Sequence, residues 1–543
     1  MALQTLITVS VLDDLPQQWQ LPMASLLLVM LTLLSILLAS AATKRRSISR
    51  SSHRRCVPPG PRGLPIIGNL HQLAAGGGAL PHRSLRDLAR RHGSTAAVMS
   101  LRLGTVPAVV VSSSAAARDV LRTHDADCCS RPDTPGPRRL SYEHNDVAFS
   151  PYSEQWRERR RLMVAEFLSK RRIQDTWYAR EAEVDKLISK LTSAGGGNEP
   201  VVLEEHVFAY MDGIVGTVAF GNIYGAEHFA YRKEQFHRVI DEAMVVRSSF
   251  TAEDYFPNAL GRLADRLFTG AAALRERVFR DFDAFFEMML QHHLDAKPNN
   301  NGNNGGGCGL IDVLIGLMKE HKFSRDAVKA LLTNTFIGAV DTDAVTIVWA
   351  MAELVRNPHL LKKAQDEIRA VVDNHKDRVH PDDVPKLRYL RTVVKETLRL
   401  HPALPLLVPR ETLRDIKVAG YDVPARTRVL VNAWAIGRDP ASWEHPEEFD
   451  PGRFEGEEGE EVGFSRARFE FLPFGAGRRM CPGIDMGVAT TEFTLANLLY
   501  CFDWELPEGM GCEDVCMEEA GGLSVHKKTP LLLVPTRYKW QQR

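Results

Sequence analysis

Helical periodicity dominates the pattern of hydrophobic and polar positions along this chain. From Ser153 onward, apolar residues recur at the spacing of one helix face over long stretches, whereas β-rich patches are short. The main β-rich patch lies at Val98–Val111, and brief strands are predicted again near Val429–Asn432 and Leu531–Val534. The pattern therefore predicts a mainly α-helical body with a small β portion.

One uncharged apolar run stands apart from this pattern. Residues Pro22–Thr43 carry no charged side chain and are mostly Leu, Met, Val, Ile and Ala, and a run of this length can cross a bilayer as one helix. Asp13 and Asp14 precede the run, and basic residues cluster after it within residues 44–55, which places the following body in the cytosol. A cleaved signal peptide is the alternative, but its basic flank would precede the apolar run.

The composition after this run indicates where the body begins. The sequence Pro58-Pro59-Gly60-Pro61 can form neither a helix nor a central strand, so we interpret it as a stiff spacer. The predicted organisation is a lumenal segment over residues 1–21, a transmembrane anchor over 22–43, a basic and proline-rich linker over 44–63, and a cytosolic body over 64–543.

Composition and charge exclude some functions without identifying one. The 543 residues are 44% hydrophobic and 25% charged, as in an ordinary globular protein, and Lys plus Arg equals Asp plus Glu at 68 each. This balance indicates no nucleic-acid partner. The cysteines form no C-x-x-C pair of zinc spacing, so we interpret Cys512 and Cys516 as reduced thiols, which fits a cytosol-facing compartment.

A glycine-rich segment near the C-terminus, Phe474–Gly483, holds one cysteine. Its glycines permit backbone conformations and close approaches that are closed to other residues. A helix is predicted over Met486–Leu499, so Cys481 lies just before a helix N-terminus, where N–H groups and the helix dipole favour a thiolate. A thiolate bound to haem iron favours O–O cleavage, and Arg479 could bind a haem propionate. The alternative is a free cysteine buried as a small hydrophobe.

A basic helix carries a second candidate for haem binding. Trp156 and Arg160 are four residues apart and share one helix face, which could meet a propionate. A solvated basic helix is the alternative when the segment is taken alone.

A long apolar helix is predicted from Phe323 to Met351, with Ser324 as its N-cap. At its centre, Asp341 and Thr342 place an acid and an alcohol in apolar surroundings, where such a pair can hold a water and relay protons. The alternative is structural, with the threonine bonding back to the preceding turn and the aspartate at a helix kink.

Glu396 and Arg399 lie on one face of a helix that ends at His401-Pro402. Such pairs are common on surfaces, where they contribute little to stability. Arg453 follows in a later segment, and a buried glutamate with two arginine partners would be a network that fixes the fold.

These segments, in this order, resemble a cytochrome P450 of the plant microsomal A-type group, from the N-terminal apolar run to Pro535. The resemblance rests on Trp156-x-x-x-Arg160, the helix centre Gly338–Thr342, Glu396-x-x-Arg399 with Arg453, and F-x-x-G-x-R-x-C-x-G at residues 474–483. It implies the cytochrome P450 fold after a single N-terminal transmembrane helix, in the endoplasmic reticulum membrane, with the catalytic domain facing the cytosol.

The resemblance also implies a role for each candidate residue. The expected roles are the axial ligand of the haem b iron for Cys481, propionate contacts for Trp156, Arg160, Arg410 and Arg479, aromatic packing on the thiolate side for Phe474, proton delivery during oxygen activation for Asp341 and Thr342, and a structural network for Glu396, Arg399 and Arg453.

Two positions depart from the family pattern. Ala339 stands where the family usually has glycine, and Asp343 stands where it has threonine or serine. Gly338 and Ala339 still form a small pair beside which a ligand has room. Asp343 is two residues from Asp341 on the helix, so we expect it to point away from that residue's face.

The function implied is a haem-thiolate monooxygenase that inserts one oxygen atom of dioxygen into a lipophilic small molecule, by hydroxylation or epoxidation. Electrons are expected from NADPH through a separate NADPH–cytochrome P450 reductase, because the chain has no nicotinamide or flavin fingerprint. Two alternatives stay open: a cytochrome P450 that rearranges or dehydrates its substrate without external oxygen, and a non-enzymatic haem-binding membrane sensor. Asp341 and Thr342 argue against the first, because such an enzyme needs no proton relay to dioxygen.

The substrate is less defined than the reaction. Leucines and a valine between residues 404 and 408 supply an apolar wall, which suits a terpenoid or another plant specialised metabolite. The segments expected to line the pocket are Arg138–Val147, Val245–Pro257, Asn334–Thr342, Ala403–Val408 and Gly521–Ser524.

Overall fold

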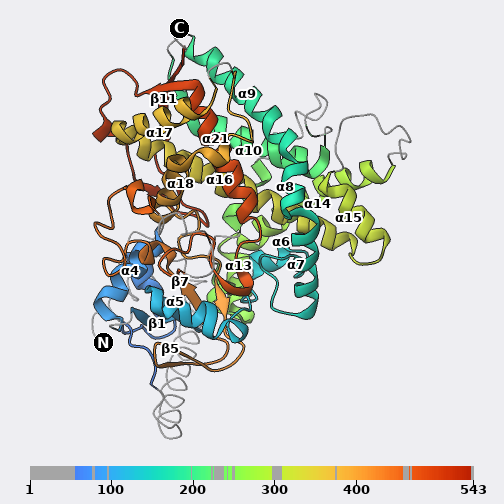
Figure 1. Ribbon diagram of the computed structural model, residues 1–543. Helices are drawn as coiled ribbons and strands as arrows, with labels where there is room; N and C mark the ends of the chain where they lie inside the picture. Colours follow the sequence, from blue (N-terminus) through green and yellow to red (C-terminus); the bar gives the residue numbers. More distant parts are fainter. Residues whose placement is uncertain are drawn as a thin grey trace, which may run out of the picture. The chain divides into compact units, whose positions relative to one another are not determined.

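The computed structural model describes residues 56–539 apart from 76–79, 95–96, 197–198, 222–223, 225–235, 237, 241, 247–250, 296–308, 374–375, 457–463 and 465–467. The body that begins at Val57 is mainly helical with small sheets, as the hydrophobic pattern predicts (Figure 1). The expected membrane anchor at Pro22–Thr43 and the basic cluster after it lie outside the described residues.

The helices and strands have the following bounds. The α-helices are α3 Leu70–Ala75, α4 Pro81–His92, α5 Ser114–Arg118, α6 Pro135–Leu140, α7 Glu154–Phe167, α8 Lys170–Asp175, α9 Trp177–Gly195, α10 Leu203–Phe220, α12 Ala252–Tyr255, α13 Ala259–Leu267, α14 Ala271–Asp295, α15 Leu310–Lys319, α16 Arg325–Arg356, α17 Pro358–Val371, α18 Arg388–Leu400, α19 Ala433–Ile436 and α21 Ile484–Cys501. The strands are β1 Val98–Leu103, β2 Val106–Val111, β3 Val201–Val202, β4 Arg410–Glu411, β5 Ile416–Val418, β6 Tyr421–Val423, β7 Arg428–Val431, β8 Phe502–Glu505, β9 Glu519–Ala520, β10 His526–Lys527 and β11 Leu532–Arg537.

Helix α16 is the central element of the hydrophobic core. It packs most extensively on α10 and also contacts α18 and α21, and every residue from Ala344 to Val355 is buried. Within the described part of the chain, α16 is the one helix long and apolar enough to cross a membrane, but 72% of its most apolar window is buried inside the body. It is therefore a core helix, and it confirms the long apolar helix predicted from Phe323 to Met351.

The start of α16 confirms Ser324 as its N-cap. The Ser324 hydroxyl accepts a hydrogen bond from the Ala327 N–H at 3.1 Å, which satisfies one of the amide groups left free at a helix N-terminus. We expect Ser324→Ala to lower the free energy of unfolding by about 1 kcal/mol. Urea denaturation checks this value, and Ser324→Thr, which keeps a capping hydroxyl, should lose much less. Equal losses in the two variants would contradict the capping role.

The strands form four small sheets among the described residues. The largest has the order β1-β2-β7-β4, in which β7 runs parallel to β2 and the other pairs are antiparallel. Gly104 in the β1–β2 turn has a φ of 63°, and a side chain there would collide with the Tyr255 carbonyl oxygen, so the turn requires glycine. Strands β7 and β11 confirm the two brief strands predicted from the sequence.

A buried ion network ties α18 to the chain beyond it. Glu396 accepts hydrogen bonds from Arg399 at 2.7 and 2.8 Å, from Arg453 Nε at 3.2 Å and from the Asp450 N–H at 2.9 Å. The side chains of Glu396 and Arg399 are fully buried, and Arg399 also donates to the Pro446 carbonyl at 2.7 Å. The three residues thus form the buried network that their spacing predicts. They do not line the cavity described below.

The proline-rich segment, which the sequence predicts to be a stiff spacer, is hydrogen-bonded to the body. The Ser100 N–H and hydroxyl donate to the carbonyls of Pro59 and Pro58, at 2.9 and 2.7 Å, and Asn69 donates to the Pro61 carbonyl at 3.1 Å. The segment therefore packs on β1, and the body begins before residue 64. Proline lacks an N–H donor but keeps its carbonyl, so a proline-rich chain can still bind the edge of a sheet in this way.

Candidate functional site

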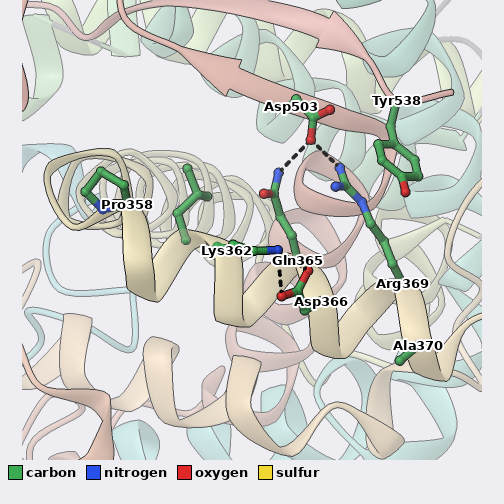
Figure 2. A pocket seen from close by; sticks show the side chains of 9 residues that line it. Pro358, Lys362, Gln365, Asp366, Arg369, Ala370, Asp503 and Tyr538 are labelled. Carbon is green, nitrogen blue, oxygen red and sulfur yellow. Dashed lines mark hydrogen bonds and ion pairs between the residues drawn. The ribbon is translucent and has the colours of Figure 1, made fainter.

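Two hollows in the body are candidates for a functional site. One, of about 540 Å³, lies on the surface between α17 and β8. There Arg369 donates to Asp503 at 2.9 Å beside Tyr538, and Lys362 pairs with Asp366 (Figure 2). These charged groups pair with one another, and none of the predicted site residues lines this hollow.

The other hollow is an internal cavity of about 340 Å³. It brings together candidates from segments far apart in sequence: Arg160, Thr342, Arg410, Phe474, Arg479 and Cys481 all line it. Of the predicted site residues outside the structural network, only Trp156 and Asp341 do not line this cavity. The cavity is therefore the candidate site.

The cysteine loop forms one wall of the cavity. Gly475 and Gly477 have φ values of 66° and 72°, and a side chain on Gly477 would lie 2.5 Å from the Leu121 carbonyl oxygen. The loop therefore requires glycine at these positions. The Cys481 N–H donates to the Phe474 carbonyl at 2.9 Å, which closes the loop just before α21 begins at Ile484.

The ionisation of Cys481 differs from the sequence-based expectation. Burial raises the pKa of the Cys481 thiol to about 11, and the lowering effect of a hydrogen bond from the Gly483 N–H is smaller. The position before a helix is as predicted, but its favourable dipole does not overcome desolvation.

The cavity is strongly cationic near the cysteine loop. Arg131, Arg160, Arg410 and Arg479 all line it. Burial and the neighbouring guanidinium groups of Arg479 and Arg410 hold the pKa of Arg131 well below its usual value, and burial lowers the pKa of Arg479 to about 9. This concentration of positive charge needs an anionic ligand, and a flat porphyrin with two carboxylates supplies one. A cysteine on one wall and arginines near its loop therefore fit haem.

The arginines are held by main-chain and carboxylate partners. Arg410 pairs with Asp125 at 2.8 Å and donates to the Ala476 carbonyl at 2.6 Å, and Arg160 donates to the Met480 carbonyl at 2.5 Å. Arg131 donates to the carbonyls of Val408 and Pro409, which fixes it beside the apolar wall of the cavity. The sequence analysis did not identify Arg131, because its burial and its partners on distant segments appear only in the folded chain.

Trp156 supports the site without facing it. The sequence predicts that Trp156 contacts a haem propionate. In the structure its indole N–H donates instead to the Val147 carbonyl at 2.9 Å. The Arg479 guanidinium carbon lies 3.8 Å from the centre of the Trp156 ring, and Arg479 also donates to the carbonyls of Cys129 and Ser150, both at 2.7 Å. Trp156 therefore positions Arg479 by a cation–π contact.

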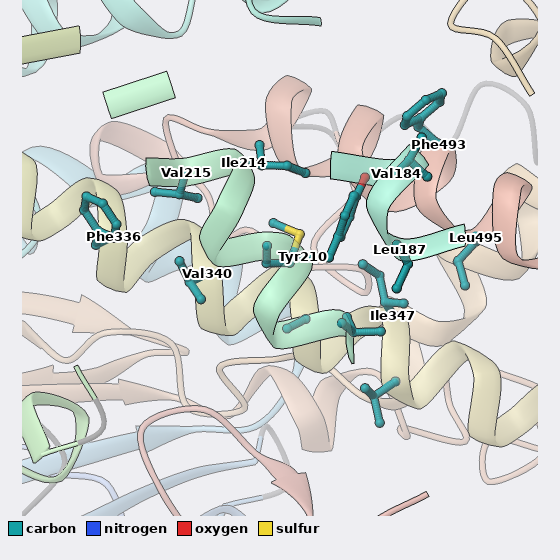
Figure 3. Packing of buried hydrophobic residues seen from close by; sticks show 14 of the residues in the cluster. Val184, Leu187, Tyr210, Ile214, Val215, Phe336, Val340, Ile347, Phe493 and Leu495 are labelled. Carbon is teal, nitrogen blue, oxygen red and sulfur yellow. The ribbon is translucent and has the colours of Figure 1, made fainter. Parts of the chain in front are cut away.

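Helix α16 forms the wall that carries the acid–alcohol pair. Figure 3 shows Phe336 and Val340 on this helix packed in a cluster with Ile214 and Val215 of α10. Apolar packing of this kind holds the helix in place. The Thr342 hydroxyl lines the cavity and donates to the Gly338 carbonyl at 2.6 Å. This back-bond is the structural alternative considered for Thr342, but it leaves the oxygen free to accept a hydrogen bond from the cavity side.

The two aspartates next to Thr342 lie in different surroundings. Asp341 is buried and lies against Ser524 and His526, outside the cavity. Asp343 does line the cavity, with Oδ1 close to Gly487 of α21, and burial raises the pKa of Asp343 to about 7. The two side chains point away from each other, as their spacing predicts. The acid that faces the cavity is Asp343 and not Asp341.

The predicted pocket segments contribute unequally. Asn334–Thr342 and Ala403–Val408 supply several lining residues each, and Val147 is the lining residue from Arg138–Val147. Described residues of Val245–Pro257 and Gly521–Ser524 do not line the cavity. Leu404, Leu407 and Val408 form the apolar wall expected for a lipophilic ligand.

Comparison with known proteins extends these observations. A family model described as cytochrome P450 matches residues 58–534. A 4-hydroxyphenylacetaldehyde oxime monooxygenase from Sorghum bicolor is 56% identical over 97% of both chains. A 2-methylbutanal oxime monooxygenase from Manihot esculenta is 44% identical over 98% of this chain and 100% of its own length. A zebra fish cytochrome P450 solved with progesterone has a similar fold, with a TM-score of 0.69 over 84% of this chain and 99% of that chain, at 23% identity.

Proposed function

Because this chain belongs to the cytochrome P450 family and is a haem-thiolate monooxygenase of the plant A-type group, we propose that its substrate is an aldehyde oxime. The observation that carries the proposal is the 56% identity, over nearly the whole chain, to a relative named as an oxime monooxygenase. A second relative with that activity in its name is 44% identical over an equal span. An oxime replaces the terpenoid suggested by the apolar wall, because composition alone does not separate lipophilic substrates.

Different residues of the cavity would bind different parts of the haem. We assign the axial position to Cys481, the propionates to Arg160, Arg410 and Arg479, with Arg131 beside them, and packing on the thiolate side to Phe474. When bound, the haem supplies the reductive activation of dioxygen and the transfer of one oxygen atom. The arginines would neutralise the propionates, and the main-chain carbonyls to which they donate hold their guanidinium groups in place.

The substrate side of the cavity is assigned to the apolar wall and α16. Leu404, Leu407 and Val408 would exclude water from the hydrocarbon part of the oxime, and Thr342 would accept and pass on a proton at its hydroxyl oxygen. This division leaves the protein with three tasks, which are to bind, to exclude water and to deliver protons.

An aldoxime assay tests the proposal directly. The full chain, incorporated in membranes with a plant NADPH–cytochrome P450 reductase, should give a substrate-binding spectrum with 4-hydroxyphenylacetaldehyde oxime or 2-methylbutanal oxime. Product formation should require both NADPH and oxygen, and ¹⁸O₂ should label the product. A terpenoid and a fatty acid serve as comparison ligands. Stronger binding and turnover of either comparison ligand would overturn the oxime proposal, and turnover without oxygen would support the rearranging or dehydrating alternative.

A separate reductase is the proposed redox partner. Four basic residues are exposed on α7, which also carries Arg160, and on the following α8: Arg157, Arg161, Lys170 and Arg171. An exposed basic surface favours an acidic partner, and its contribution falls as salt rises. The electrons from NADPH would enter through this partner.

Attachment to the endoplasmic reticulum membrane through a single helix at Pro22–Thr43, with the catalytic body in the cytosol, completes the proposal. We expect removal of residues 1–43 to leave a haem-binding body that no longer integrates into membranes, because that run supplies the long uncharged segment. Extraction with alkaline carbonate checks this, with the full chain as control. Carbonate-resistant association of the truncated protein would contradict a sole integral anchor.

A further inference from the structure

The β9–β10 hairpin presents two polar side chains to α16. Between them, Val525 is fixed on both sides: its N–H donates to the Ala403 carbonyl at 3.1 Å, and its carbonyl accepts from Trp349 Nε1 at 2.9 Å. Side chains alternate along an extended chain, so the side chains of Ser524 and His526, on either side of Val525, point to the same face of the chain. The hairpin is thus held rigidly with both polar groups directed at one place on α16.

That place is the carboxylate of Asp341. The Ser524 hydroxyl donates to Oδ2, and His526 Nε2 lies 3.1 Å from Oδ1, so both oxygens have partners on the hairpin. The Asp341 side chain is only 8% exposed and is absent from the cavity wall, although Thr342 beside it lines that wall. The acid expected to serve the cavity is therefore held on the other side of α16.

His526 connects this buried carboxylate with solvent. Its side chain is 38% exposed, and its ring stacks on Phe208 of α10 with centroids 5.8 Å apart and planes 13° from parallel. The stacking and the contact with Asp341 fix the ring orientation. An imidazole exchanges protons with water near neutral pH, which a serine hydroxyl does not.

We propose that His526 is the proton-entry residue of the oxygenation reaction, which takes protons from solvent and passes them through Asp341 to the cavity at Thr342. The observation that carries the proposal is the direct contact of a half-exposed histidine with a buried acid whose neighbour in sequence lines the cavity. The proposal rests on the monooxygenase activity and not on which oxime is oxidised.

The transfer conserves charge and protons at each step. The His526 imidazolium gives its Nε2 proton to the Asp341 carboxylate, which leaves a neutral imidazole and a neutral carboxylic acid. The attraction that holds the carboxyl group against the hairpin is then weaker, so the acid can rotate toward Thr342 and release the proton there. The carboxylate returns to the hairpin, and solvent reprotonates the imidazole. The delivered protons and the electrons from NADPH convert the second oxygen atom to water.

Two substitutions of His526 separate proton transfer from positioning. His526→Gln keeps an N–H donor for Asp341 but cannot carry a proton, whereas His526→Ala removes both. We expect both variants to bind the oxime and to oxidise NADPH, with the ratio of product to NADPH reduced by up to about a hundredfold and peroxide released instead. His92→Gln, at the exposed end of α4, is the control and should keep the ratio of the unchanged enzyme.

A second measurement does not depend on turnover. Infrared spectra of the haem-loaded protein should contain a carboxylate band that disappears in Asp341→Asn. This band should shift in His526→Ala, because the contact of the ring with the carboxylate is lost, and shift less in His526→Gln. The carbon-monoxide difference spectrum should be unchanged in both His526 variants, which shows that the haem site is intact.

The outcomes discriminate clearly. Loss of coupling in both His526 variants, with the band shift, supports proton entry at His526. Full recovery of coupling in His526→Gln would show that His526 only positions Asp341 and would overturn the proposal, as would unchanged coupling in both variants or an unshifted band. If the unchanged enzyme does not oxygenate the oxime, the proposed substrate is wrong. The variants are then compared by the ratio of peroxide released to oxygen consumed, which replaces the ratio of product to NADPH.

Discussion

Replacement of Cys481 by alanine is expected to abolish the thiolate-type carbon-monoxide band and all NADPH-dependent oxygenation. Cys481 is the cysteine that lines the cavity among the residues that the structure describes, and Arg131, Arg160, Arg410 and Arg479 line the same cavity. The electron donation that favours O–O cleavage requires a sulfur ligand, so no neighbouring side chain replaces it. Haem content and the carbon-monoxide difference spectrum of the purified protein measure the loss.

A matched control separates ligation from general damage. Cys512 is a free cysteine at the start of a short 3-10 helix, Cys512–Asp514, and does not line the cavity, so Cys512→Ala should keep haem content, spectrum and turnover. Circular dichroism of Cys481→Ala should still show the helical body, because the core formed around α16 does not involve this residue. Retention of the thiolate-type band in Cys481→Ala would overturn the assignment of the axial ligand.

Local patterns in the sequence were sufficient to predict the helical body and the cysteine loop. The apolar run around α16 and its cap at Ser324 are set by residues close in sequence, as are the glycines that shape the turn before Cys481. Glu396 and Arg399 are also one helix turn apart, so their shared face was predictable. Each of these features depends on spacing within a short segment.

Features that depend on distant segments were not predictable in this way. The partners of Asp341 lie on a hairpin 183 residues further along the chain, and no pattern near Asp341 indicates them. The high pKa of the Cys481 thiol likewise comes from burial by the whole fold, whereas the position before a helix suggested the opposite direction. The packing of Pro58–Pro61 on β1 was not predictable either, because proline composition indicates a stiff chain but not the element on which it packs.

Replacement of Thr342 by alanine is the second change with a large expected effect. We expect haem content and oxime affinity to be largely unchanged, because Thr342 contributes one hydroxyl to a cavity with a predominantly apolar wall. NADPH should still be consumed, but with peroxide released in place of product, and the product-to-NADPH ratio should fall by about a hundredfold or more. Parallel assays of NADPH, peroxide and product measure this ratio.

A second threonine on α16 controls for the structural contribution. Thr333 makes an equivalent bond, with its hydroxyl donating to the Lys329 carbonyl at 2.9 Å, but it does not line the cavity. Thr333→Ala should therefore lose stability by about 1 kcal/mol without any change in coupling. Equal coupling in Thr333→Ala and Thr342→Ala would mean that the Thr342 hydroxyl is only structural.

Asp343 provides the sharpest test of where the proton enters the cavity. It lines the cavity with its pKa raised to about 7 by burial, so its protonated form, which can donate, predominates below that pH and is lost above it. If Asp343 substitutes for the missing hydroxyl, the residual coupling of Thr342→Ala should decrease as the pH rises through about 7, and the double variant Thr342→Ala with Asp343→Thr should lose both the residual coupling and its pH dependence. If Thr342→Ala is uncoupled at every pH, Asp343 does not replace the missing hydroxyl, and proton delivery depends on Asp341 and Thr342. Unchanged coupling in both variants would show that neither Thr342 nor Asp343 of α16 is needed to deliver the proton.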